Sequence, residues 1–349
     1  MTQLTVGILG CGHIAPTHVR AWKKDSRFRV TGVFDLNREL AQSLTSRTAA
    51  GAVFDSSEQL IRESDVVDIC TPPASHFPLI EAAIAERKHI VVEKPVVIDP
   101  AEWSRVLALL EHYDASFSVI HHMKFARAVR TAKQWLDEGR LGRLLRIETY
   151  FATHSDVDRM LGGEPHWSHG LPGGRWFETL PHNLYLTHHL AGPLRFDGVT
   201  ATRTECAPGG VGVDEVIVSL AGPDILGTIH FSANCRHNYR WAVLIGSKGV
   251  LRMDLLSDAL AFDRVPDSRA TRVAGRLFLS ALAALARAPA DRALNIGDRL
   301  ASWTPHARFV EHLGDHLCAS SGPPTPMEEI QYTVENCYTI GAAIEASQA

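Results

Sequence analysis

The 349-residue sequence has few cysteines and no cysteine pattern that would staple a fold together. The six cysteines lie far apart, at positions 11, 70, 206, 235, 318 and 337, and none belongs to a C-x-x-C pair. A disulfide framework or a zinc knuckle needs a tighter and more regular spacing. We therefore expect free thiols.

The sequence also lacks a long apolar run and an excess of basic residues. No stretch of about 18 consecutive apolar residues occurs, so no membrane-spanning helix is expected. The chain passes directly from Met1 into an apolar run at 6–10 without the regions of a secretory signal, so we expect a cytoplasmic protein. Thirty-five Lys and Arg against 39 Asp and Glu give a formal net charge of −4, and nucleic acid is not expected as a partner.

The hydrophobic pattern changes character near residue 122. Before it, short apolar runs alternate with segments of helical periodicity, which is typical of a parallel sheet covered by helices. After it, alternating apolar and polar runs predict antiparallel or mixed strands. We predict an α/β protein with a Rossmann domain, a doubly wound parallel sheet, over residues 1–122. An α/β domain with a mixed, largely antiparallel open sheet follows over residues 123–349 and provides the substrate wall and the oligomer interface.

A glycine-rich loop follows the first expected strand. Gly10-Cys11-Gly12-His13-Ile14-Ala15 lies between an apolar run and a helical segment. The first glycine permits a tight turn, the second lets the main chain approach a pyrophosphate, and the small third residue allows close helix–strand contact. We interpret Gly10, Gly12, His13 and Ile14 as dinucleotide-binding residues rather than as a plain glycine turn.

An acidic residue closes the second expected strand. Asp35 follows Gly12 by 23 residues, and its carboxylate would accept hydrogen bonds from the adenosine ribose hydroxyls and repel a 2′-phosphate. Arg38 either offsets that repulsion in part or is a solvated residue at a helix start. We therefore favour NAD over NADP, with a plain helix N-cap as the alternative for Asp35.

Two further motifs, together with the loop, resemble those of the Gfo/Idh/MocA family of oxidoreductases. Thr71-Pro72-x-x-x-His76 and Glu93-Lys94-Pro95 each follow an expected strand. The resemblance covers nearly the whole chain. It implies that Thr71, Pro72 and His76 lie beside the nicotinamide half of the cofactor, that Glu93 also lies at the cofactor, and that Lys94 faces the reacting carbon.

The lysine makes chemical sense in that place. An ammonium beside a carbonyl oxygen can donate a hydrogen bond as alkoxide character develops. A cis peptide before Pro95 fits the turn that follows Lys94. The alternative for Lys94 is a surface lysine at a strand end.

A second cluster, at 173–182, is similar to the family's G-G-x-x-x-D-x-x-x-H segment. On a helix, residues four apart lie on one face, so Glu178 and His182 would converge on the same substrate oxygen. In this interpretation His182 takes the hydroxyl proton with Lys94 assisting, and Glu178 orients the substrate or the imidazole.

The cluster also departs from the family pattern, which leaves the proton relay and the substrate open. Glu178 stands in place of aspartate, Pro181 precedes the histidine, and Tyr185 occupies a position where many members have a second aspartate. Lys124 replaces a frequent arginine. The residues expected to contact the substrate are Lys94, Lys124, His154, Arg175, Trp176, Glu178 and His182.

Two other features have alternatives. His166-x-x-His169 could hold a zinc ion, but the family chemistry needs no metal and we expect none. The apolar helical segment 274–288, framed by arginines, could lie on a membrane surface, but packing within the protein or at a subunit contact is favoured.

We predict an NAD-dependent oxidoreductase that transfers a hydride between nicotinamide and a hydroxyl or ketone of a sugar, cyclitol or sugar derivative, as a homodimer or homotetramer. A redox-neutral alternative uses tightly bound NAD transiently during epimerisation or glycoside cleavage. A non-catalytic dinucleotide-sensing regulator on the same fold is the third possibility. The presence of both Lys94 and His182 argues against the regulator.

Overall fold

The computed structural model describes residues 3–158, 160–161, 166–204, 212–264, 304–319 and 321–347. Its contacts separate two compact units, residues 1–122 with 303–335 and residues 123–302 with 336–349, and each is described by itself. The sequence predicted one boundary near 122, with everything after it in the second domain. The structure differs because helix α9 (Pro305–Ala319) packs against helix α1 (Ala15–Trp22) of the first unit.

The first unit is built on a six-stranded parallel sheet with the strand order β3-β2-β1-β4-β5-β6. The strands are β1 (Leu4–Leu9), β2 (Phe28–Phe34), β3 (Ala52–Val53), β4 (Val66–Ile69), β5 (His89–Val92) and β6 (Phe117–Val119). This is the Rossmann order, in which the direction of winding reverses at β1 and ligands bind outside the carboxyl ends of the strands. The predicted fold class of this half is confirmed.

Helices cover this sheet, and their first residues explain where several of them start. The remaining helices are α2 (Arg38–Thr48), α3 (Ser57–Glu63), α4 (His76–Ala85) and α5 (Pro100–Leu110), with a 3-10 turn at Pro73–Ser75. Asn37, Ser56 and Asp99 accept main-chain N–H groups at the starts of α2, α3 and α5. Such caps satisfy N–H groups that have no partner within the helix. No side chain caps α1, the helix that follows the glycine loop.

The second unit contains a seven-stranded sheet with the order β13-β12-β11-β7-β10-β9-β8. The strands are β7 (Leu144–His154), β8 (Arg195–Thr202), β9 (Glu215–Ala221), β10 (Leu226–Ser232), β11 (Asn234–Gly246), β12 (Gly249–Asp254) and β13 (Ala259–Arg264). β7 and β10 run parallel and the other neighbours antiparallel. This is the mixed, largely antiparallel sheet that the alternating pattern predicted.

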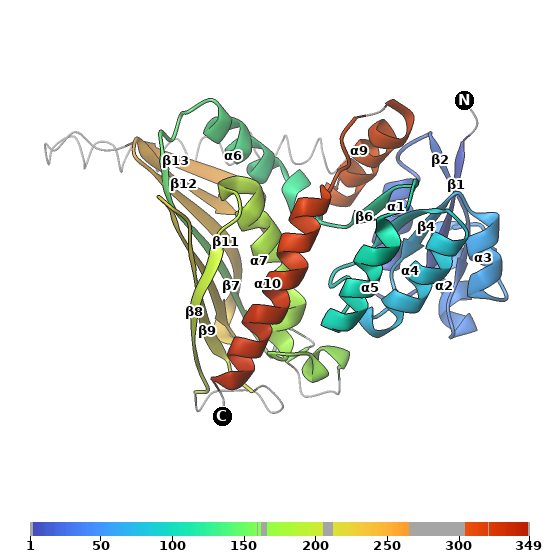
Figure 1. Ribbon diagram of the computed structural model, residues 1–349, viewed down its shortest axis with the longest axis horizontal. Coiled ribbons are helices and arrows are strands. Elements are labelled where there is room, and N and C mark those ends of the chain that lie inside the picture. Colours follow the sequence, from blue (N-terminus) through green and yellow to red (C-terminus); the bar gives the residue numbers. More distant parts are fainter. Residues whose placement is uncertain are drawn as a thin grey trace, which may run out of the picture. The chain divides into compact units, whose positions relative to one another are not determined.

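One face of this second sheet is covered by helices, and the described residues leave the other face open. Helices α6 (Arg127–Asp137) and α7 (Arg175–Ala191) pack on the covered face, with 3-10 turns at His122–Phe125 and Trp167–Gly170 (Figure 1). The unit also includes α10 (Met327–Ala346) from residue 336 onward. Among the described elements, none covers the opposite face.

Two sequence-based expectations concern membranes. The segment 274–288 lies outside the described residues. Among the helices that the structure describes, none is long and apolar enough to cross a membrane.

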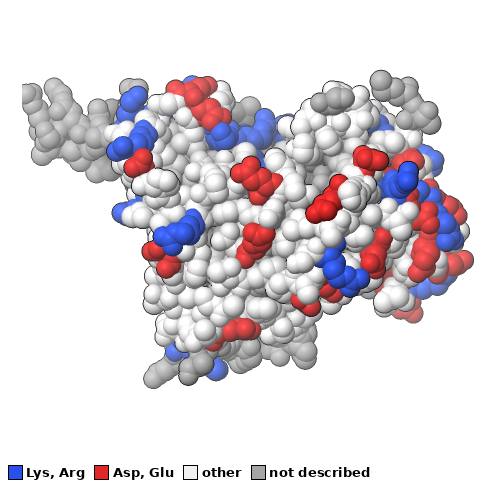
Figure 2. All heavy atoms as spheres, in the orientation of Figure 1, with Lys and Arg blue, Asp and Glu red and all other residues white. Residues whose placement is uncertain are grey.

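On the visible face of the Rossmann unit, acidic and basic side chains are interspersed rather than gathered into a patch of one sign (Figure 2).

Candidate functional site

The glycine loop joins β1 to α1 at the carboxyl edge of the parallel sheet. Gly10 has a φ of 91°, and a Cβ there would lie 2.8 Å from the main chain of Cys70 and Thr71, so only glycine fits. A Cβ on Gly12 would meet nothing within 4 Å, so the main chain there borders open space. A tight turn, an open approach to the main chain and an uncapped helix start together suit a pyrophosphate.

Asp35, at the end of β2, is hydrogen-bonded to this loop. Its Oδ2 accepts the N–H of Cys11 at 2.7 Å and its Oδ1 accepts the N–H of Asn37 at 2.8 Å. The N-cap of α2 is Asn37, so Asp35 is not the plain cap considered above. Arg38 forms an exposed ion pair with Asp55 at 2.7 Å.

The Thr-Pro-x-x-x-His segment follows β4. Thr71 accepts a hydrogen bond from Ser75 at 2.8 Å. His76 is fully buried, with Nδ1 2.8 Å from the carbonyl oxygen of Val96 and Nε2 2.7 Å from that of Thr71. Burial lowers the pKa of His76. His76 therefore ties the segment after β4 to the segment after β5.

The Glu-Lys-Pro segment follows β5, and the peptide between Lys94 and Pro95 is cis, the isomer that the sequence allowed without establishing it. Lys94 is half-buried. Glu93 is buried, and its Oε2 accepts the main-chain N–H of Lys94 at 3.0 Å while its Oε1 lies 3.0 Å from Nε2 of His18. Its carboxylate thus faces the protein interior.

In the second unit, Arg175 is the first residue of α7. It is 3% exposed, and its guanidinium pairs with Asp158 at 2.7 Å and with Glu178 at 3.1 Å. It also donates to the hydroxyl of Thr179. Two buried or half-buried carboxylates neutralise this arginine, so it anchors Glu178 and is not exposed for a substrate. The expected direct contact between Arg175 and a substrate is therefore not supported by its burial.

Glu178 and His182 lie one turn apart on α7, both half-buried. Nδ1 of His182 is 2.9 Å from the hydroxyl of Tyr185, and that hydroxyl accepts the main-chain N–H of Met123 at 3.2 Å. The departure from the family pattern at Tyr185 thus has a structural counterpart. The fully buried phenol of Tyr185 contacts the imidazole at the position where many family members have an aspartate.

Trp176, which was expected in the substrate wall, is buried, and its burial does not support a direct contact with a substrate. The side chain is 1% exposed, donates from Nε1 to the carbonyl of Val213 at 2.8 Å, and stacks on Phe231 with ring centroids 5.2 Å apart. The ring belongs to the core between α7 and the sheet. A sequence cannot distinguish a tryptophan that faces a substrate from one on the adjacent, inward face of the helix.

The other predicted contacts differ in exposure. Lys124 is buried in the 3-10 turn after β6, with its ammonium 6.0 Å from the ring centroid of Phe125. His154 is half-buried at the end of β7 and pairs with Asp156 at 3.2 Å. Nothing in these contacts assigns either side chain to a substrate.

The His166-x-x-His169 pair does not have a metal-binding geometry within the described part of the chain. His166 contacts Ser168, and His169 contacts the carbonyl of Met160. The groups of metal-ligating atoms that lie close together among the described residues both contain His18 and neither contains this pair.

Two residues that the sequence did not single out lie near the predicted ones. Arg240 on β11 is half-buried, its guanidinium lies 4.7 Å above the ring centroid of Phe151, and its Nε has no hydrogen-bond partner among the described residues. Burial lowers the pKa of Arg240, and the negative charge of Glu178 opposes that shift. Leu36, next to Asp35, is 96% exposed although it is apolar. Neither belongs to a motif, so only the fold reveals them.

A Rossmann sheet with a glycine loop, an acidic residue after β2 and a lysine after β5 defines a dinucleotide-dependent oxidoreductase class. Residues 4–121 match the profile of the oxidoreductase family with an NAD-binding Rossmann fold, and residues 129–252 match the GFO/IDH/MocA C-terminal domain. The two matches together cover well over half of the chain. The chain belongs to the Gfo/Idh/MocA family, and its first unit is that family's NAD-binding domain.

Curated relatives match only part of the chain. The glucose-6-phosphate 3-dehydrogenase of Bacillus subtilis is 27% identical over 154 residues, 44% of each chain. The UDP-N-acetylglucosamine 3-dehydrogenase of Acidithiobacillus ferrooxidans is 28% identical over 134 residues, 38% of this chain and 42% of the relative. The matched segments thus span less than half the length of these relatives.

Solved structures share the whole fold at low identity. The WlbA dehydrogenase of Bordetella pertussis, in complex with NADH and UDP-GlcNAcA, superposes with a TM-score of 0.77 at 16% identity, over 98% of this chain and 96% of that one. A levoglucosan dehydrogenase in complex with NADH and levoglucosan gives 0.68 at 20% identity, over 78% of each chain. At such identities these structures establish the shared fold.

Proposed function

We propose that this chain is an NAD-dependent oxidoreductase that transfers a hydride between nicotinamide and a hydroxyl or ketone of a sugar, cyclitol or sugar derivative. One observation carries the proposal: the glycine loop after β1 and Lys94 after β5 end at the same carboxyl edge of one parallel sheet. Ligands of Rossmann domains bind at that edge. Membership of the family and similarity to sugar dehydrogenases support the substrate class.

The residues around the loop fit a dinucleotide. Gly10, Gly12, His13 and Ile14 would hold the pyrophosphate, where an added Cβ on Gly12 meets open space. Asp35 would hold the adenosine ribose, and its carboxylate has enough acceptor sites for the ribose hydroxyls besides its two main-chain donors.

The same region bears on the choice of cofactor. Arg38 is engaged by Asp55, which supports NAD over NADP because less positive charge faces a 2′-phosphate. Leu36 offers an exposed apolar surface beside that ribose, suited to the adenine ring. NAD, when bound, accepts or supplies the hydride.

Lys94 and His182 serve as acid and base at the substrate oxygen. Oxidation of an alcohol releases one proton with the hydride, and the proton goes to Nε2 of His182, since Nδ1 lies against Tyr185. Lys94 donates a hydrogen bond to the oxygen as negative charge develops. Glu178, fixed by Arg175, accepts a hydrogen bond from a substrate hydroxyl and so orients the sugar.

Arg240 favours an anionic substrate. A half-buried guanidinium near Glu178, with no hydrogen-bond partner for its Nε among the described side chains, suits a phosphate, a carboxylate or a diphosphate. The relatives named for glucose 6-phosphate and UDP-N-acetylglucosamine act on sugars of this kind. The substrate is then a negatively charged sugar derivative rather than a free sugar.

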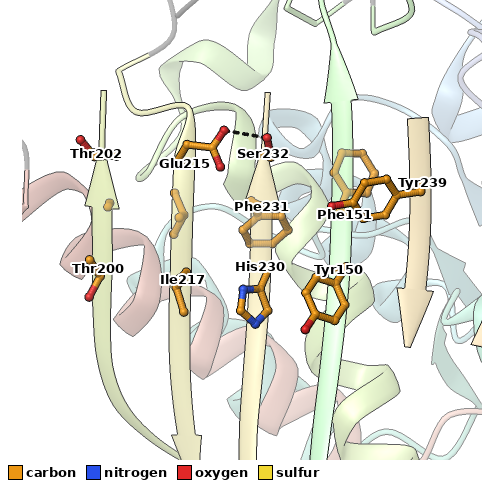
Figure 3. A pocket seen from close by; sticks show the side chains of 12 residues that line it. Tyr150, Phe151, Thr200, Thr202, Glu215, Ile217, His230, Phe231, Ser232 and Tyr239 are labelled. Atoms are coloured by element: carbon orange, nitrogen blue, oxygen red, sulfur yellow. Dashed lines mark hydrogen bonds between the residues drawn. The ribbon is translucent and has the colours of Figure 1, made fainter. Parts of the chain in front are cut away.

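A second copy of the chain is the proposed partner, as a homodimer or homotetramer. The open face of the seven-stranded sheet has a hollow of 260 Å³ over β7 to β11, lined by alternate side chains such as Tyr150, Ile217 and His230 (Figure 3). Ile217 and Trp241 on this sheet are 44% and 45% exposed. Apolar side chains on an uncovered sheet are typical of a subunit interface.

The test is a panel of glucose 6-phosphate, UDP-N-acetylglucosamine, myo-inositol and levoglucosan, each incubated with the protein and NAD while NADH absorbance is recorded. Accumulation of NADH in excess of the enzyme, strongest with an anionic sugar, supports the proposal. Substrate conversion without accumulating NADH would support the redox-neutral alternative instead. NAD binding with no conversion of any sugar of these classes would favour the regulator.

A further inference from the structure

The first unit buries a cluster of ionisable side chains that the proposed chemistry does not use. His18 lies on α1, Asp68 on β4, Cys70 just after β4, Glu93 just after β5 and His306 on α9. All five are buried, and the relative exposures of His18 and Asp68 are 1% and 0%. Their side chains connect the helix that follows the glycine loop to the ends of two central strands.

His18 stands between two carboxylates. Its Nδ1 lies 2.9 and 3.1 Å from the two oxygens of Asp68, and its Nε2 lies 3.0 Å from Oε1 of Glu93. An imidazole donates from both nitrogens only when both carry a proton. Burial is the largest single effect and lowers the pKa of His18, but the charges and hydrogen bonds of Asp68 and Cys70 together outweigh it, and the pKa is raised well above its usual value. The two contacts with carboxylates and the direction of the pKa shift point to the imidazolium as the form of His18.

Each carboxylate has a further partner. Asp68 accepts a hydrogen bond at 2.6 Å from Nε1 of Trp22, which lies one helical turn after His18, so α1 holds Asp68 at two points. Glu93 accepts the main-chain N–H of Lys94 at 3.0 Å. Burial alone raises the pKa of Glu93, but the hydrogen bond and charge of His18 and the charge of Lys94 lower it to about 2. Glu93 thus remains a carboxylate.

We propose that His18 is a positioning residue for Lys94. The imidazolium, held on α1 by Asp68, fixes the carboxylate of Glu93, and that carboxylate fixes the main chain from which the Lys94 side chain extends. Charge-assisted hydrogen bonds are short and directional, so the two bonds of Glu93 transmit position rather than charge alone. The inference rests on the role proposed above for Lys94.

A zinc ion bound by part of this cluster is the competing explanation for its arrangement. His306 is stacked on His122 with ring centroids 4.2 Å apart, and its Nε2 has no hydrogen-bond partner within the described chain. Burial and the charge of His18 lower the pKa of His306 to about 4, so it is neutral. Ligand atoms of His18, Glu93 and His306 lie within 4.8 Å of one another, a donor set that zinc accepts. A zinc ion would bind Nε2 of His18 only without its proton, so the protonation of Nε2 distinguishes zinc binding from the positioning role.

The direct test is nitrogen-15 NMR of the full chain with NAD bound, labelled at histidine. The His18 signals are identified by their loss in His18→Gln. We expect both ring nitrogens of His18 to be protonated at neutral pH and to remain so above the pH at which exposed histidines titrate. A deprotonated Nε2, or one zinc ion per chain by elemental analysis, would overturn the proposal.

The functional test uses His18→Gln, which keeps an amide donor but not the charge or the second donor. Displacement of a reacting group by about 1 Å costs on the order of 10²-fold in rate, and we expect a loss of about that size in single-turnover NADH formation with NAD affinity unchanged. Amide exchange of the peptide 91–97 should become faster, because Glu93 no longer holds the N–H of Lys94. In a Lys94→Ala background the same substitution should add little further loss.

A matched control substitutes another histidine next to the same strand. His89, at the amino end of β5, accepts the N–H of Ser116 at 3.1 Å, and His89→Gln retains an acceptor there. It should change neither the rate nor the exchange of residues 91–97. Normal turnover by His18→Gln with an inactive Lys94→Ala would refute the positioning role alone. Normal turnover by both variants would refute the proposed function as well.

Discussion

Asp35 offers the sharpest test of how this chain selects its cofactor, and the substitution is Asp35→Ser. In the structure its two oxygens accept main-chain N–H groups of Cys11 and Asn37 at 2.7 and 2.8 Å. Serine is too short to reach either donor from the same position and removes the charge. The substitution therefore loosens the glycine loop from the end of β2 and removes the proposed acceptor of the ribose hydroxyls.

The magnitude follows from those contacts. Hydrogen bonds to a charged group contribute about 1.5 to 3 kcal/mol each, and Asp35 is half-exposed, so water recovers part of each loss. We expect a net loss of about 1.4 to 2.8 kcal/mol in binding, which is about a 10- to 100-fold rise in the Kd for NAD. The Kd for NADP should change less, because a repulsive charge disappears together with the acceptors.

Isothermal titration of wild type and variant with NAD and with NADP measures both quantities. Asp114→Ser is the matched control, since this exposed aspartate lies before β6, at the opposite edge of the sheet from the loop. It should change neither Kd. Wild-type protein that binds NADP more tightly than NAD, or an Asp35→Ser variant with an unchanged NAD affinity, would refute the reasoning.

The remaining predictions concern the substrate, the pH dependence and the assembly. Arg240→Gln should raise the KM for anionic sugars by at least about tenfold, as expected for loss of a charge-assisted hydrogen bond, and should leave the KM for neutral sugars unchanged in steady-state assays. The lowered pKa of Glu93 contributes stability that is present above pH 4.5 and is lost as the pH falls toward about 2. The raised pKa of His18 contributes stability that is complete below pH 6.5 and is lost as the pH rises through the folded-state value. Urea unfolding at a series of pH values should therefore show the highest free energy of unfolding between these limits. His18→Gln should lower the free energy of unfolding there and weaken its dependence on pH. Ile217→Lys or Trp241→Lys should convert the assembly to monomers in light scattering without changing the circular dichroism, and an unchanged mass would exclude the open sheet face as the interface.

The fold class was predictable because each unit has a local hydrophobic pattern that is typical of its sheet. Continuous apolar runs between helical segments predict a buried parallel sheet, and the buried strands β4 and β5 have that pattern. Alternation predicted β9 and β10, whose residues are buried in turn on one face only. Strand β3 could not be predicted in this way, because its two residues are too few to carry a periodicity. The placement of α9 with the first unit was missed because it depends on a contact with α1, almost 300 residues earlier in the chain.

Only those residues of the candidate site that belong to sequence motifs were predictable. The glycine loop, Asp35 and Lys94 carry local patterns that reflect what a dinucleotide site needs. Burial carries no such pattern, so Trp176 was expected in the substrate wall although it lies in the core.

The His18 cluster was beyond sequence reasoning for a different reason. Its hydrogen bonds join residues 50 and 75 positions apart, which only the strand order brings together. The one local trace is the spacing of His18 and Trp22, which places both on the same face of α1 and against Asp68.

The central claim is that Lys94 and His182 are the acid and base of hydride transfer, and single-turnover NADH formation tests it most directly. Lys94→Ala and His182→Ala are measured at saturating NAD on an anionic sugar that the wild type oxidises, alongside NAD titrations. Each substitution should lower the rate by about 10² to 10⁴, with NAD affinity retained. Because both serve one proton transfer, the double variant should lose much less than the product of the two single losses. A near-wild-type rate in either single variant would contradict the account.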